Sequence, residues 1–300
     1  MLTASETEYI RGFRYSPVLH LASIESPRGD WDRVLLTMLT ACFDASGSEH
    51  DQQYLVVAGF ISSISDWLSF EEAWEKRLQE DGIRCFHAVE FAQSFGEFEH
   101  GWKNDESRRR RLSGDLMVII QKHVYRKFGE VIVNSELSRI SQEIRKAFLI
   151  NAYSLAGRTC VGKAGSWANS GCRGVQVGYV FESGDAGKGA LMTRMTKDGY
   201  QDPIFQPKRD HINPDGSIVR RFVPLQAADW WAYELFKACK QFPDRVANPE
   251  AFRWGMTMFD TIHGEPGLYT AADLEELEKN LRLHLDMNEW AGRFERRQTG

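Results

Sequence analysis

The stretch that decides the fold is an apolar run that ends in an acid and a turn; over residues 34–48 it reads VLLTMLTACFDASGS. The apolar part has the length of a buried strand, and the Asp-Ala-Ser-Gly sequence that begins at Asp44 is typical of a turn. A second apolar run, YLVVAGFI, follows over residues 54–61. The two runs together predict a β-hairpin. We therefore expect the core to begin at Val34, with residues 1–33 as an N-terminal extension.

Strand and helix signals alternate along the rest of the chain. Helical spacing of apolar residues predicts helices that begin near 65 and 105 and others at 139–158, 188–198 and 224–241. The helix near 105 is expected to reach about 127, and strands are expected at 84–88, 131–133 and 175–181. The Gly-, Ser- and Ala-rich stretch 162–174 predicts a loop. This alternation favours an α/β sheet flanked by helices, which forms one domain over 34–243, followed by a helical addition over 244–300.

The composition is that of an ordinary globular protein. The 300 residues are 42% hydrophobic and 26% charged, which excludes a collagen-like or disordered chain. The first residues lack the pattern of a signal peptide, and no run of about 18 apolar residues is present, so we expect no membrane association. Five scattered cysteines without a CxxC pair favour reduced thiols and a cytoplasmic protein.

Four segments place acids at the ends of predicted elements or, for Asp229, inside one. Asp44 and Glu182 each end a strand, Glu90 stands where a strand passes into a helix, and Asp229 lies inside the nearly apolar stretch LQAADWWAY. Each acid alone could form a turn or begin a helix. Together they predict a site for a hard divalent ion such as Mg²⁺ or Mn²⁺, because buried carboxylates are costly unless they are paired or bind a metal. Two such ions can cleave a phosphodiester, one activating water and the other stabilising the leaving oxygen.

The chain resembles the DUF3800 family in five segments, at 43–47, 54–60, 86–90, 180–185 and 225–233. The resemblance implies a ribonuclease H-like mixed sheet over roughly 36–240, with acids placed for two-metal nuclease chemistry. It implies Asp44, Glu90, Glu182 and Asp229 as catalytic residues and metal ligands. The chain departs from the family at Ala45, where Glu is usual, and at Glu182, where Asp is common. Asp185 is therefore an alternative metal ligand to Glu182.

Basic residues are distributed unevenly along a chain whose net charge is -5. The stretch 101–128 holds 8 bases and 3 acids, and 188–221 holds 7 bases and 4 acids. Because phosphate contacts supply most sequence-independent affinity for nucleic acid, such local clusters could hold a polyanion. The predicted substrate-binding residues are His87, Lys188, Lys208, Arg209 and His211. Trp230 and Trp231 are expected mainly to pack in the core.

The leading hypothesis is a Mg²⁺- or Mn²⁺-dependent nuclease that hydrolyses RNA or DNA, and family association suggests a role in phage defence. The alternative is a weak or inactive module of the same fold that binds nucleic acid or a protein. A second copy of the chain is a further partner that the sequence leaves open. A glycosidase with two carboxylates ranks last, because it leaves Asp229 without a role.

Overall fold

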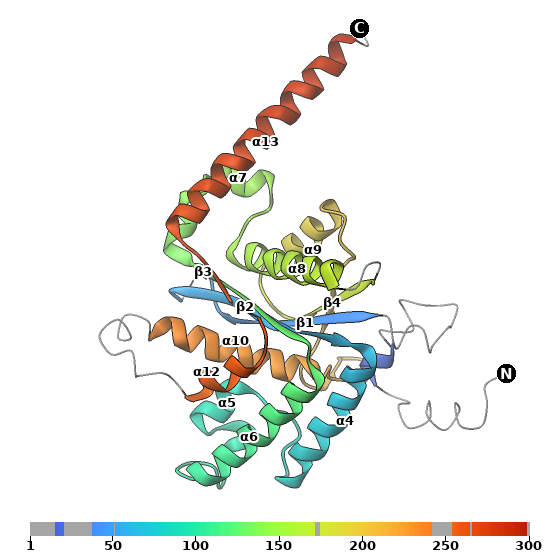
Figure 1. Ribbon diagram of the computed structural model, residues 1–300, viewed down its shortest axis with the longest axis vertical. Helices are drawn as coiled ribbons and strands as arrows, with labels where there is room; N and C mark the ends of the chain where they lie inside the picture. Colours follow the sequence, from blue (N-terminus) through green and yellow to red (C-terminus); the bar gives the residue numbers. More distant parts are fainter. Residues whose placement is uncertain are drawn as a thin grey trace, which may run out of the picture.

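The computed structural model describes residues 16–20, 38–50, 52–171, 175–241, 254–264 and 266–298. Within these ranges the chain forms a mixed six-stranded sheet with helices on both faces (Figure 1). The predicted α/β class is thus confirmed. Most of the predicted N-terminal extension lies outside the described residues. Its described part, residues 16–20, brings Val18 into the core.

The predicted hairpin lies at the middle of the sheet. Strand β1 (Leu39–Gly47) runs antiparallel to β2 (Tyr54–Ser63), with Cys42 opposite Phe60. Both strands are rich in residues that favour a buried sheet, and β2 is buried along its whole length. Asp44 was expected in the turn, but it lies inside β1, because β1 stays paired with β2 as far as Gly47.

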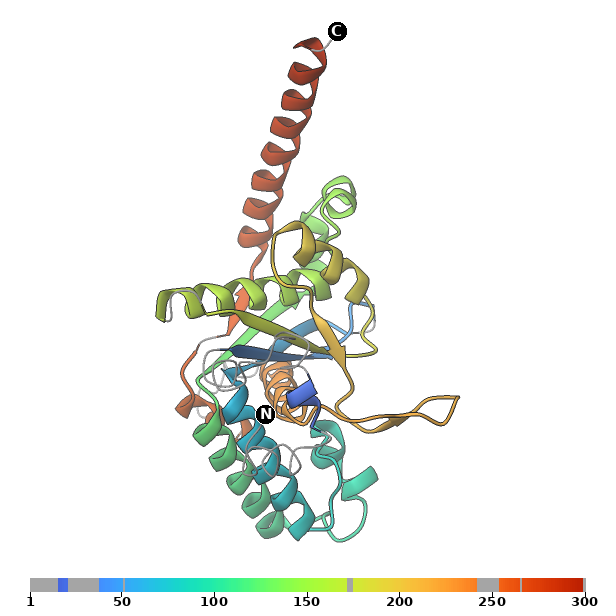
Figure 2. The ribbon, with the colours of Figure 1, turned by 90° about the vertical axis from the view of Figure 1, so that its right-hand side faces the viewer.

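The remaining strands extend the sheet on both sides in the order β5-β4-β1-β2-β3-β8. Strand β2 is antiparallel to both neighbours, whereas the pairs β1–β4, β4–β5 and β3–β8 are parallel. These strands are β3 (Arg126–Val133), β4 (Val177–Glu182), β5 (Ile204–Gln206) and β8 (Gly267–Tyr269). Strands β6 (His211–Ile212) and β7 (Ile218–Val219) form a separate hairpin, which projects from the body (gold in Figure 2).

One face of the sheet is covered by α10, which packs across β1 and β2, and by further helices beneath it (Figure 1). The helices of this side are α4 (Ile64–Glu80), α5 (Ala88–Gln93), α6 (Glu106–His123), α10 (Pro224–Lys240) and α12 (Trp254–Met258), with the 3₁₀ turns η1 (Gly96–Phe98) and η3 (Phe259–Thr261). Trp230 and Trp231 are both buried in this layer, as expected. We call it the α10 side of the sheet.

The opposite face is covered by α8, which packs on β2 and β3. The elements of this side are α7 (Gln142–Ala147), α8 (Ala152–Gly171), α9 (Lys188–Lys197) and α13 (Ala271–Gln298), with the 3₁₀ turn η2 (Asn134–Arg139). The predicted C-terminal helix is confirmed as α13, which begins against the body and then points away from it (Figure 1). No helix among the described residues is both long enough and apolar enough to span a membrane.

Two predictions about α8 were wrong. The helix expected over 139–158 is divided into α7 and α8, and Leu149 between them has a positive φ of 54°. The loop expected over 162–174 is helical as far as Gly171. The small residues that suggested a loop instead allow close packing, since Gly157 contacts Leu191 and Gly165 lies against Tyr179.

Other element ends also differ from the sequence predictions. Residues 84–88 form no strand, because the backbone amides of Phe86 and Ala88 donate to the side chains of Gln226 and Asp229 rather than to a neighbouring strand. Helix α6 ends at His123, before β3 begins at Arg126. Helix α4 begins at Ile64 and is capped by the hydroxyl of Ser63.

Gly59 is required by the close approach of β1. A Cβ atom at this position would lie 1.8 Å from the carbonyl oxygen of Cys42. We expect Gly59→Ala to lower the free energy of unfolding by about 3 kcal/mol or more, because the two central strands would have to separate. Chemical denaturation of the purified variant measures this loss.

Gly114→Ala is the matched control. Gly114 lies in α6, and a Cβ atom added there would meet nothing within 4 Å, so alanine should stabilise the helix by about 0.5–1 kcal/mol. Equal stability of Gly59→Ala and wild type would show that the strands adjust to the added methyl group.

Glu71 in α4 gives stability a pH dependence. Burial raises the pKa of Glu71 to about 7, and the negative charge of Glu75 adds to this rise. The hydrogen bond that the Ser16 hydroxyl donates to the Glu71 carboxylate opposes the rise. The unfolded pKa is about 4.3, so the folded state keeps the proton longer and loses stability as pH rises from about 4.3 to about 7. Glu71→Gln should therefore be more stable than wild type at pH 8 by about 1–2 kcal/mol, after allowance for partial exposure.

Thermal melting of wild type and Glu71→Gln at pH 5 and pH 8 tests this. The gain should be small at pH 5, where the carboxyl is already protonated. Glu72→Gln, at an exposed neighbouring position, is the control and should show no such difference. A gain that is the same at both pH values would contradict the assignment.

Candidate carboxylate site at the edge of the sheet

Asp44 and Glu182 are brought together by the pairing of parallel strands. Phe43 of β1 is paired with Phe181 of β4, so the next residue of each strand lies at the same edge of the sheet. Side chains alternate between the two faces of a strand. Cys42 and Val180 pack on the α10 side, and Asp44 and Glu182, two residues further on, therefore face α10 as well.

Asp229 reaches the same edge from α10. This helix begins with Pro224, which suits a first helical turn, and it crosses β1. The Asp229 carboxylate uses its two oxygens differently. Oδ2 accepts a hydrogen bond of 2.6 Å from the backbone amide of Ala88, at the start of α5. Oδ1 points to the position between Asp44 and Glu182.

The ammonium group of Lys208 occupies that position. Its Nζ atom lies 2.9 Å from Asp44 Oδ2, 2.9 Å from Glu182 Oε2 and 2.8 Å from Asp229 Oδ1. Lys208 belongs to the loop between β5 and β6. Three carboxylates from β1, β4 and α10 thus surround one cation, and we call this group the carboxylate cluster.

The cluster carries more negative than positive charge. Burial by itself would lower the pKa of Lys208, but the charges of Asp44, Asp229 and Glu182 hold it well above its usual range. Burial raises the pKa of Asp44; Lys208 opposes this, and Glu182 and Asp229 add to it. With all three acids ionised the cluster has three negative charges and one positive charge, a surplus of two. Such a surplus favours the entry of further positive charge.

Glu90 lies in an adjoining group with His87 and Arg209. Its Oε1 atom is 2.5 Å from Arg209 Nη2 and 3.5 Å from His87 Nδ1, while His87 Nε2 is 3.7 Å from Asp229 Oδ1. The positive φ of 59° at Gly96 brings the chain so close to Glu90 that a Cβ there would lie 2.5 Å from Oε2. His87 therefore stands between Glu90 and the carboxylate cluster.

Asp185 lies beside the cluster without contacting Lys208. Burial raises its pKa to about 6, and the charge of Glu182 adds to this rise. The hydroxyl of Tyr153 lies close enough to favour the ionised form of Asp185, and so it opposes this rise. Of the two alternatives left by the sequence, Glu182 shares a cation with Asp44 and Asp229, and Asp185 does not.

Two predicted substrate-binding residues stand apart from the cluster. Lys188 begins α9 and lies 5.8 Å from the ring of Phe205, and His211 is exposed on the projecting β6–β7 hairpin. Two arginines of α6 are engaged within the fold, whereas Arg110 and Arg111 are exposed. Arg108 bonds to Asp81, and Arg109 donates to the carbonyl oxygen of Phe91.

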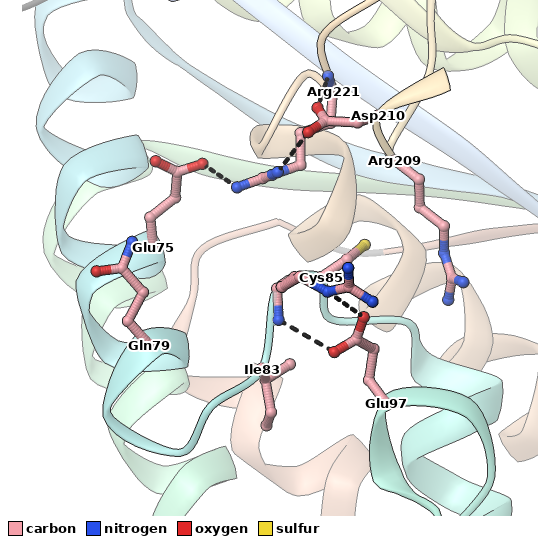
Figure 3. Close-up of a pocket in the computed structure, with 9 residues that line it drawn as sticks. Glu75, Gln79, Ile83, Cys85, Glu97, Arg209, Asp210 and Arg221 are labelled. Carbon is pink, nitrogen blue, oxygen red and sulfur yellow. Dashed lines mark hydrogen bonds and ion pairs between the residues drawn. The ribbon is translucent and has the colours of Figure 1, made fainter. Parts of the chain in front are cut away.

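A cavity of about 340 Å³ opens beside the Glu90 group (Figure 3). Its charged lining residues are Arg84, Arg209 and Arg221, with Glu75, Glu97 and Asp210. Most of these charges are paired with each other, since Arg84 contacts Glu97 and Arg221 contacts both Glu75 and Asp210. Arg209 links this cavity to Glu90, and the volume is that of a small ligand pocket.

The donor chemistry of the cluster fits a divalent ion, but a lysine now fills the position. Carboxylate oxygens from separate elements are the ligands that Mg²⁺ and Mn²⁺ prefer. In the described part of the chain, no group of three or more His, Cys, Asp or Glu side chains is arranged to hold a metal ion directly. Mg²⁺ requires oxygens at about 2.0–2.1 Å, closer than those around Lys208.

Gln226 is a structural residue of the site that the sequence reasoning missed. Its Oε1 atom accepts hydrogen bonds from Trp74 Nε1 and the Phe86 amide, and its Nε2 atom donates to the carbonyl oxygen of Lys208. It therefore ties α4, the segment before α5 and the Lys208 loop to α10. The signal available in the sequence was a polar glutamine three positions before Asp229, in a nearly apolar stretch.

Searches against known protein families, curated proteins and solved structures found no match to this chain.

Proposed function

We propose that this protein is a Mg²⁺- or Mn²⁺-dependent nuclease of ribonuclease H-like fold, which hydrolyses phosphodiester bonds of RNA or DNA. The carboxylate cluster is the observation that carries this proposal. Asp44, Glu182 and Asp229 direct three oxygens at one cation, each at 2.8–2.9 Å. Buried acids that converge in this way are costly without a cation, so this arrangement of carboxylates favours the binding of positive charge.

The strand arrangement supports the ribonuclease H-like part of the proposal. Such a fold sets an antiparallel three-stranded meander beside parallel strands, with helices on both faces. Here β1, β2 and β3 form the meander, and β4 and β5 continue it in parallel beside β1. The acids stand at the first strand, at the fourth strand and on a late helix, as the resemblance to the DUF3800 family implies.

Asp44, Glu182 and Asp229 would hold the first ion, and Glu90 would contribute to a second. Divalent ions bound there supply an activated water and offset the negative charge that develops on the phosphate. Arg209, which pairs with Glu90 and lines the cavity, is placed to contact a phosphate of the substrate. We also propose a role in phage defence, which rests on the family association alone.

A binding module without catalysis is the second candidate. The observation that favours it is that Lys208 already occupies the cation position of the cluster, together with Ala45 in place of an extra acid. Such a module would bind nucleic acid or a protein and would not depend on metal. The two candidates differ in whether a divalent ion binds at the cluster.

Cleavage should depend on Asp44 and Asp229. We expect Asp44→Asn and Asp229→Asn to lose at least about a hundredfold in cleavage rate, the scale seen when one group that stabilises a transition state is removed. The assay follows labelled RNA, DNA and hybrid substrates in Mg²⁺ or Mn²⁺. Asp260→Asn, at an exposed position in η3, is the matched control and should cleave like wild type. Equal cleavage by all four proteins would refute the assignment.

Glu182, rather than Asp185, should be the third metal ligand. Glu182 shares the Lys208 cation with the other two acids, whereas Asp185 makes no contact with it. Calorimetric titration with Mn²⁺ should therefore show affinity reduced at least about tenfold in Glu182→Gln. Asp185→Asn should change it less than about threefold. The opposite ranking would identify Asp185 as the ligand.

A further inference from the structure

We propose that Lys208 is a built-in counter-cation that holds the carboxylate cluster when no metal is bound and must leave it when a divalent ion enters. Metal binding at this site is then a competition with a residue of the same chain. This inference deepens the proposed function and rests on its metal site, but it does not require that nucleic acid be cleaved.

The cluster needs a cation in its metal-free state. The side chains of Asp44, Asp229 and Glu182 are only 0%, 9% and 19% exposed, and that of Lys208 is 12% exposed. Within the described part of the chain, Lys208 is the cation whose ion pairs reach all three acids, and the neighbouring Arg209 pairs with Glu90. Without Lys208, Asp44 and Glu182 would lose the ion pair that each makes with it, and Asp229 would keep its contact with His87. The three acids would then face one another without a shared cation, which is unfavourable.

Lys208 and a metal ion would compete for the same atoms. Asp44 Oδ1 accepts a hydrogen bond from the Ala45 amide at 2.7 Å, and Asp229 Oδ2 accepts one from the Ala88 amide. The remaining oxygens of these two acids are the ones that contact Lys208 Nζ. A divalent ion that used these oxygens would therefore displace the ammonium group, since two cations cannot share the position.

The exchange requires a movement of the side chain, not of the loop. The backbone of the loop is fixed by hydrogen bonds from the Phe222 amide to Pro207 O at 2.7 Å and from Gln226 Nε2 to Lys208 O at 3.2 Å. The flexible four-carbon stem of lysine can rotate its ammonium group out of the cluster while these bonds remain. The cost of the exchange then appears as a lower apparent metal affinity. The apparent affinity is the intrinsic affinity of the cluster multiplied by the fraction of molecules in which Lys208 has left it.

The test compares wild type with Lys208→Met, which keeps a flexible, unbranched side chain one atom shorter than lysine and removes its charge. Lys197→Met, at an exposed position of α9, is the control for the loss of one positive charge. In EDTA, Lys208→Met should melt roughly 5 °C or more below wild type, because the acids have lost their counter-cation. Calorimetric titration should show that Lys208→Met binds Mn²⁺ at least about tenfold more tightly than wild type, with Lys197→Met unchanged.

A second measurement uses the unmodified protein and so does not depend on the folding of the variant. Acylation of lysine amines, read by mass spectrometry, should modify Lys208 slowly in EDTA and several times faster in Mn²⁺, while Lys197 reacts equally in both. Mn²⁺ affinity in Lys208→Met that is equal to or weaker than in wild type, or labelling of Lys208 that does not respond to Mn²⁺, would overturn the proposal. Competition without any cleavage of nucleic acid would support it and refute the nuclease assignment alone.

Discussion

The contact of one ammonium group with three carboxylates is the interaction on which the arrangement of this protein depends. It joins elements that are distant in sequence, because Asp44 belongs to β1, Glu182 to β4, Lys208 to the loop after β5, and Asp229 to α10. Each element would bury an unpaired charge if the others were displaced. The ends of β1 and β4 are thus held in place by electrostatics. The centre of the sheet is held by the close packing of β1 against β2 at Gly59.

Much of the fold could be predicted from the sequence, because its central elements carry local signals. The hairpin followed from two apolar runs, and the neighbouring positions of Asp44 and Glu182 followed from acids at the ends of strands. The prediction of a strand over 84–88 was wrong because backbone amides of this segment donate to side chains of α10, which no local pattern indicates. The loop predicted over 162–174 was wrong because small residues also serve close helix packing.

The central position of Lys208 could not have been predicted in this way. Lys208 was expected to bind substrate, because it lies in a basic loop before the helix that carries Asp229. A lysine in a loop carries no periodicity that shows where its side chain points. Its position is set by long-range contacts, with Gln226 holding its carbonyl oxygen and Phe222 holding the residue before it. Charge counting along the chain also does not show which bases are available to a ligand, because Arg108 and Arg109 of the basic stretch 101–128 bond within the fold, whereas Arg110 and Arg111 are exposed.

The β6–β7 hairpin separates Lys208 from α10 in sequence without separating them in space. Its base is closed by the hydrogen bond from the Phe222 amide to Pro207 O, and among the described residues its two strands pair only with each other. Insertions or deletions at its tip would therefore leave the ammonium group and the carboxylates in register. The tip of this hairpin is a place where the length and sequence of the chain can change while the cluster stays unchanged.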